Sequence, residues 1–207
     1  MKRFLAPVLL SAALGAATLS AAADTYTIDK GHSEAAFQVR HLVTKVRGHF
    51  NDFACTIQVD PKNAEASSVE FTVQTASVAS DNESRDKHLK SADFFDVEKY
   101  PVMTFKSSKI KKVSNERFDV TGTLELKGVK KEITLPVTFS GFVKTPWGGE
   151  VAGFETQVTL NRKDFGMVWN KALDNGGALV GDEALITINI EAKKQAAAPA
   201  AAAPAAK

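Results

Sequence analysis

Apolar and polar residues alternate along most of the chain between residues 34 and 191, a period of two that is typical of half-buried β-strands. In the first such segment, Ala35, Phe37 and Val39 share one face, while Gln38 and Arg40 share the other. Comparable segments occupy residues 53–59, 69–73, 118–126, 133–139, 154–160 and 186–190, and residues 101–112 form a weaker one. The pattern therefore predicts an all-β fold of about eight antiparallel strands.

Short connections separate most of these segments, with turn signals at residues 60–63, 114–115, 127–128 and 147–149. Eight alternating strands fit either a sandwich or a barrel. Sequential connections favour an up-and-down order, which closes into an eight-stranded antiparallel barrel that is either packed solid or holds one small ligand. A short helical insertion is expected around residues 82–95, with Ser80-Asp81 as its candidate cap.

The N-terminal residues 1–23 have the pattern of a cleavable secretory signal. Lys2 and Arg3 precede a short apolar stretch, and three alanines at 21–23 supply the small-residue cleavage site. A membrane anchor fits less well, because the stretch is short, rich in alanine and interrupted by Pro7. No later segment is long enough to span a bilayer, so a secreted protein is expected.

The C-terminal residues 195–207 are almost entirely Ala and Pro, a composition that predicts a disordered tail. The folded domain is accordingly expected over residues 24–194. The net charge argues only against a nucleic-acid partner. The whole chain has 26 Lys+Arg and 24 Asp+Glu, a formal net charge of +2. Removing residues 1–23 takes away two cations, which leaves a mature chain of zero net charge, so no nucleic-acid partner is expected.

Catalytic and metal-binding patterns are scarce. The single cysteine excludes a disulfide framework, and Cys55 lies on the apolar face of its strand, where a thiol is expected to be buried and unreactive. The four histidines, His32, His41, His49 and His88, are singly placed. Strand pairing could bring the first three together around a metal, but their spacing is not diagnostic, and neither a metal nor a cofactor is expected.

Two long segments, 79–100 and 162–182, interrupt the strand pattern and are expected to plug or frame an opening of the barrel. The first contains Arg85-Asp86-Lys87-His88, which fits either a short solvated helix or contacts to a polar head group. An enzyme that uses His88 or His41 as a base, with Asp86 or Asp164 as its partner, remains an alternative.

Phenylalanine is the most informative residue type, with 13 copies against two Trp and two Tyr. Core packing explains any one of them, but on a closed sheet they together predict an apolar cavity. Burying about 400 Å² of hydrocarbon there yields about 10 kcal/mol before association costs. The candidate ligand-binding residues are Phe37, Val39, Phe53, Phe71, Val73, Phe94, Phe95, Phe105, Phe118, Phe139, Phe154, Phe165 and Trp169, with Arg85, His88 and Asn170 near a polar mouth.

Several ordered motifs make the chain recognisable. They include Tyr26-Thr27-Ile28-Asp29 with His32-Ser33, the stretch from Arg85 to Asp96, Tyr100-Pro101-x-Met103-Thr104-Phe105, Asn161-Arg162-Lys163-Asp164-Phe165-Gly166 and Val180-Gly181-Asp182-Glu183. In order and spacing, the sequence resembles the YceI-like family of periplasmic lipid-binding proteins over most of the mature chain.

The resemblance implies a lipocalin-like barrel with a long hydrophobic tunnel that holds a polyisoprenoid, an isoprenoid quinone or its precursor, or a fatty-acyl amphiphile. It implies a periplasmic carrier or sequestering protein and supplies no catalytic residues. The expected partner is thus a long-chain lipid, and the mature protein is expected to have no membrane-spanning segment. A homodimer, and a stress or interaction protein with a solid core, are left open.

Overall fold

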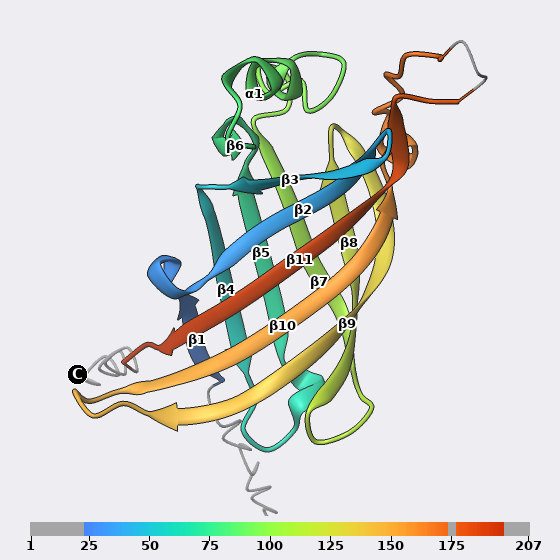
Figure 1. Ribbon diagram of the computed structural model, residues 1–207. Coiled ribbons are helices and arrows are strands. Elements are labelled where there is room, and N and C mark those ends of the chain that lie inside the picture. Colours follow the sequence, from blue (N-terminus) through green and yellow to red (C-terminus); the bar gives the residue numbers. More distant parts are fainter. Residues whose placement is uncertain (1–22, 174–176, 197–207) are drawn as a thin grey trace, which may run out of the picture.

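Antiparallel β-strands make up most of the protein in a computed structural model, which describes residues 23–173 and 177–196 (Figure 1). The strands are β1 (Asp24–Ile28), β2 (Glu34–His41), β3 (Thr44–Phe50), β4 (Phe53–Val59), β5 (Ser68–Gln74), β6 (Val78–Ala79), β7 (Val102–Lys112), β8 (Arg117–Leu126), β9 (Val129–Lys144), β10 (Glu150–Asn161) and β11 (Val180–Lys194). The helices are α1 (Glu83–Lys90) and four 3-10 turns, η1 (Lys30–His32), η2 (Ala64–Ala66), η3 (Thr75–Ser77) and η4 (Arg162–Phe165). The predicted signal and tail fall on residues 1–22 and 197–207, which lie outside the described residues, apart from Ala23, Gln195 and Ala196 at their edges.

Strand pairing closes the sheet into a barrel. The order β1-β4-β5-β7-β8-β9-β10-β11 returns to β1, because the last residues of β11 pair with β1. Every pairing is antiparallel, and β11 also pairs with β2 nearer its start. The predicted eight-stranded antiparallel barrel with a single short α-helix is therefore confirmed for the described residues.

The sequence pattern did not assign three of the strands. Strand β6 has only two residues, and the five residues of β1 include only two apolar ones, Tyr26 and Ile28. The third, β3, carries Lys45 and Arg47 with Gly48 and shows no clear apolar alternation. Together with β2 and β6, β3 extends the sheet beyond the ring at one end of the barrel.

The helix α1 begins one residue later than the predicted cap would place it. Its N-cap is Asn82, whose side chain accepts a hydrogen bond from the Arg85 amide at 2.9 Å. The predicted cap residue Ser80 has another role, since its buried hydroxyl donates to Asp86 and accepts from the guanidinium of Arg85. After Lys90 the chain continues in turns, so residues 91–95 of the predicted insertion are not helical. None of the described helices has the length and hydropathy that crossing a bilayer requires.

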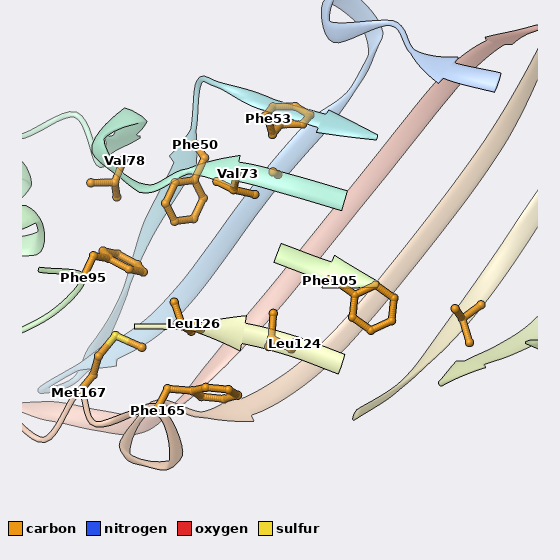
Figure 2. Packing of buried hydrophobic residues seen from close by; sticks show 12 residues of the cluster. Phe50, Phe53, Val73, Val78, Phe95, Phe105, Leu124, Leu126, Phe165 and Met167 are labelled. Carbon is orange, nitrogen blue, oxygen red and sulfur yellow. The ribbon is translucent and has the colours of Figure 1, made fainter. Parts of the chain in front are cut away.

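Two groups of buried residues fill the barrel at different depths. The first centres on Phe95, Leu124, Leu126, Phe165 and Met167, whose side chains point inward from the walls and from the loops at one end (Figure 2). The second closes the other end. Its members are Tyr26, Cys55, Ile57, Ala152, Ile190 and Ala192.

The polar atoms of this second group are hydrogen-bonded or buried as neutral groups. Tyr26 is almost fully buried, and its hydroxyl donates to the Glu150 carboxylate at 2.5 Å. Cys55 is buried as predicted, and burial raises the pKa of its thiol to about 12. This end of the barrel is thus a packed core rather than an opening.

Candidate ligand-binding cavity

A cavity of about 620 Å³ occupies the barrel above the packed end. Its volume lies in the range of sites that enclose small molecules. The strand walls contribute aliphatic side chains from the inward-facing positions of alternating segments. They include Leu124, Leu126, Ile133, Leu135, Val158, Leu160, Ile186 and Ile188. Sequence reasoning emphasised phenylalanine and did not single out these aliphatic residues, although the same alternation identifies their faces.

Most of the sequence-predicted site residues meet in this cavity. The lining includes Phe37, Val39, Phe71, Val73, Phe94, Phe95, Phe105, Phe165 and Trp169, together with Arg85 and His88. Two of these rings, Phe37 and Phe95, lie 6.3 Å apart between centroids and pack with Phe50, a lining residue that was not predicted. The centroid of Phe50 lies 5.7 Å from that of Phe37 and 5.4 Å from that of Phe95. Their role in ligand binding stays a prediction.

Four predicted residues do not line the cavity: Phe53, Phe118, Phe139 and Phe154. Phe139 packs against Phe154 at 5.3 Å and against Phe118 at 6.4 Å, deep in the barrel towards the packed end. Phe53 belongs to the buried core and lies 5.9 Å from Phe71. These rings face inward as the alternation indicates, but they fill the interior and so do not line the space.

The cavity opens at the end of the barrel where α1 lies. Of its described lining residues, only Arg40, Asn82 and Ser84 are exposed, and they come from the end of β2 and the start of α1. The two predicted loop segments frame this mouth, with Phe94 and Phe95 from one and Met167 and Trp169 from the other. Figure 1 shows both segments at the same end of the barrel.

Polar side chains at the mouth are held in fixed positions. The Arg85 guanidinium donates to the Ser80 hydroxyl at 2.7 Å and to the Ser80 carbonyl at 2.6 Å. The His88 Nε2 lies 2.9 Å from an Asp93 carboxylate oxygen, and its ring centroid lies 4.6 Å from that of Trp169. Among the described lining residues, every charged side chain is basic.

Arg162 is a structural residue at the mouth that sequence reasoning missed. Its side chain is only 4% exposed and donates to the carbonyls of Met167 at 2.5 Å, Trp169 at 2.8 Å and Gly181 at 2.8 Å. An Asp182 carboxylate oxygen lies 3.4 Å away. Burial lowers the pKa of Arg162, and the charge of Asp182 opposes that shift. One guanidinium thus ties the second loop segment to β11.

Asn170, a candidate for head-group contact, is also used structurally. Its amide nitrogen donates to the Val180 carbonyl at 2.7 Å, and its amide oxygen accepts from the Val180 amide at 3.1 Å. It is not among the residues that line the cavity.

The three N-terminal histidines do not come together. His41 lies at the mouth, His49 lies at the far end of the β2–β3 pairing, and His32 lies in η1. His32 is instead grouped with Asp29 and Glu191, at 3.0 and 3.7 Å from its Nδ1. These three could hold a metal ion, but Lys193 already contacts Asp29 at 2.6 Å. Hydrogen bonds from Lys193 and then His32 hold the pKa of Asp29 well below its usual range.

The acid–base pairs of the enzyme alternative are not formed. His88 contacts Asp93, whereas Asp86 accepts from Ser80 and Asp164 pairs with Lys131 at 3.0 Å on the outside. The predicted partners of His88 and His41 are therefore engaged elsewhere.

Fold and site together define an antiparallel β-barrel with an apolar, one-ended cavity. The family model described as YceI-like domain matches residues 26–192, so the chain belongs to the YceI-like family. A curated relative, the UPF0312 protein of Azotobacter vinelandii, is 42% identical over 170 residues, covering 81% of this chain and 88% of its own.

Solved structures agree on the architecture. The YCEI protein of Campylobacter jejuni matches with a TM-score of 0.65 and 34% identity, over 76% of this chain and 90% of its own. A polyisoprenoid binding domain from Saccharophagus degradans, implicated in plant cell wall breakdown, matches with a TM-score of 0.61 over 82% of this chain and 98% of its own. At 12% identity, this second likeness shows the fold alone.

Proposed function

We propose that the protein binds one long-chain apolar molecule in the barrel and sequesters or carries it through an aqueous compartment. The observation that carries the proposal is the cavity of about 620 Å³ with almost wholly apolar walls. Water molecules find few hydrogen-bond partners in such a space. A hydrocarbon chain that moves from water into it is stabilised by the transfer free energy of its buried apolar surface. A polyisoprenoid, an isoprenoid quinone or precursor, and a fatty-acyl amphiphile all have this chemistry.

The ligand's polar end would lie at the mouth, near Arg85 and His88. Both side chains are fixed by protein contacts, to Ser80 and to Asp93, so little conformational entropy is lost when they meet a head group. A solved polyisoprenoid binding domain has the same fold, so a barrel of this architecture can accommodate this class of ligand. A chemical step is not part of the proposal.

Localisation in the periplasm is part of the same proposal. It rests on the sequence pattern of residues 1–23, whose described portion is limited to Ala23. A carrier of this kind is useful where a lipid must leave one membrane and cross water.

The experiment is solvent extraction of the protein purified from its own host, followed by lipid mass spectrometry. We expect about one long-chain apolar molecule per chain. In the variant Ile133→Trp an indole fills the cavity from β9, and we expect it to lose this molecule; Glu132→Trp places the same ring on the exposed face of β9 and should keep it. Equal lipid content in both folded variants, or none in the wild type, would refute the proposal.

A further inference from the structure

Exposed apolar side chains gather around the mouth of the cavity. Leu42 and Val43 form the β2–β3 turn and are 42% and 87% exposed, and Val168, in the loop after η4, is 65% exposed. The Leu42 amide donates to the Leu179 carbonyl at 3.0 Å, which ties the turn to the rim. Leu42 adopts a φ of 50°, a conformation that a leucine rarely takes. This conformation belongs to the two-residue turn that joins β2 and β3.

Cations accompany these side chains. Residues 35–51 contain Arg40, Lys45 and Arg47 and no Asp or Glu. Arg40 and Lys45 lie directly opposite each other in the β2–β3 pairing. Like charges in this position destabilise a sheet, and within the described chain no carboxylate forms an ion pair with any of the three. Like charges that face each other beside an exposed apolar turn favour an anionic partner for this surface.

Apolar tips flanked by cations match the interface of an anionic lipid bilayer. The apolar side chains enter the boundary between head groups and acyl chains, and Lys or Arg side chains contact the lipid phosphates. We propose that a docking rim, formed by Leu42, Val43, Val168, Arg40 and Lys45, places the mouth of the cavity against such a bilayer. This inference rests on the proposed function, because a mouth that faces the membrane lets a long-chain ligand pass without crossing water.

The opposite end of the barrel provides an internal comparison. Trp147, in the turn between β9 and β10, is 83% exposed. Figure 1 shows this turn at the far end of the barrel from α1. One cation at this end, Lys194, is neutralised, since it pairs with Asp24 at 2.6 Å and lies 3.9 Å from Glu150. Exposed apolar side chains therefore occur at both ends of the barrel, and what distinguishes the mouth is the opening of the cavity beside them.

Cosedimentation with vesicles tests the docking rim. We expect the full-length protein to bind phosphatidylcholine vesicles that contain phosphatidylglycerol, more weakly as salt rises, and to bind pure phosphatidylcholine poorly. Leu42→Ser with Val43→Ser should weaken binding about tenfold or more, and Arg40→Gln or Lys45→Gln about fivefold each. Trp147→Ser should leave binding unchanged. Absence of wild-type binding, or loss of binding only in Trp147→Ser, would overturn the proposal.

Tryptophan fluorescence provides a second readout that does not depend on variants of the rim. Trp147→Phe leaves Trp169 at the mouth as the only tryptophan of the chain, and Trp169→Phe leaves Trp147. Brominated phosphatidylglycerol vesicles should quench Trp169 but not Trp147. Quenching of Trp147 alone would assign docking to the closed end. Binding that inorganic phosphate displaces, and that Leu42→Ser with Val43→Ser leaves intact, would assign the cations to a soluble anion.

The cavity-filled variant Ile133→Trp separates failure of this inference from failure of the proposed function. Its docking rim is unchanged, so it should bind vesicles as the wild type does while carrying no lipid. A wild type that carries lipid but ignores vesicles would refute docking alone.

Discussion

The ring of Phe37 lies directly over Gly48 on the paired strand, so closely that a Cβ on Gly48 would lie 2.3 Å from the ring's Cζ. Gly48 is itself buried, and Phe37 lines the cavity. The absence of a side chain at position 48 therefore sets how far the ring lies back against the wall, and hence how much space is left for a ligand.

Gly48→Ala should push the Phe37 ring into the cavity. We expect affinity for a fluorescent long-chain fatty acid to fall by about tenfold, with a loss of stability of about 1–3 kcal/mol from overpacking. Titration of the delipidated protein measures the first effect and urea unfolding the second. Gly31→Ala is the control, because its Cβ would lie at an ordinary 3.4 Å from Asp29, far from the cavity. Unchanged affinity in folded Gly48→Ala would contradict this account of the wall.

Replacing Arg162 should loosen the mouth. Lysine is charged but lacks the planar fork that reaches three carbonyls, so Arg162→Lys is expected to cost about 2–4 kcal/mol of unfolding free energy. Hydrogen exchange should speed up over the loop that follows η4 and leave β4 and β5 protected. Lys163→Met removes the neighbouring, exposed partner of Asp182 and should cost far less. Equal effects of the two variants would show that the buried hydrogen bonds of Arg162 contribute little.

The His32 cluster predicts a pH dependence with a definite sign. The hydrogen bond to Asp29, and then the charges of Asp29 and Glu191, raise the pKa of His32. A pKa that is higher in the folded than in the unfolded protein adds stability that is complete below the unfolded value of about 6.5 and is lost as pH rises through the folded value. The Tm advantage of wild type over His32→Asn should therefore be larger at about pH 6 than at about pH 9. The contribution is small because the ring is exposed, and an advantage that grows with pH would contradict the assignment.

Cys55 should be inert while the barrel is folded. Its thiol is buried at the packed end and has a pKa raised to about 12, so almost no thiolate is present at neutral pH. We expect reaction with Ellman's reagent at about pH 8 to be at least 100-fold slower in the native protein than in urea. Rapid labelling without denaturant would show that this end of the barrel opens.

The alternation of apolar and polar residues predicted eight of the strands, because each residue's face depends only on its neighbours. It missed β1, which completes the ring, and the short connections rather than the alternation favoured a barrel over a sandwich. Depth along the barrel depends on long-range register instead. Phe139 and Phe154 face inward, but their pairing places them at the packed end, while Phe37 and Phe105 line the space. For this reason the sequence identified the inward rings but not which of them border a cavity.

The residues that shape the mouth were predictable only in part. Loop length and composition indicated correctly that 79–100 and 162–182 frame an opening. Arg162 gave no periodic signal, since its partners are backbone carbonyls up to 19 residues away. Asn170 looked like a free polar contact, yet the fold uses its amide to hold Val180.

The most direct test of the hollow barrel is a crystal structure of the protein purified from its own host without removal of lipid. We expect continuous density for one extended chain that begins near Arg85 and His88 and runs past Phe37 and Phe105 towards Leu135. A cavity filled by the protein's own side chains, or occupied only by water, would contradict the account.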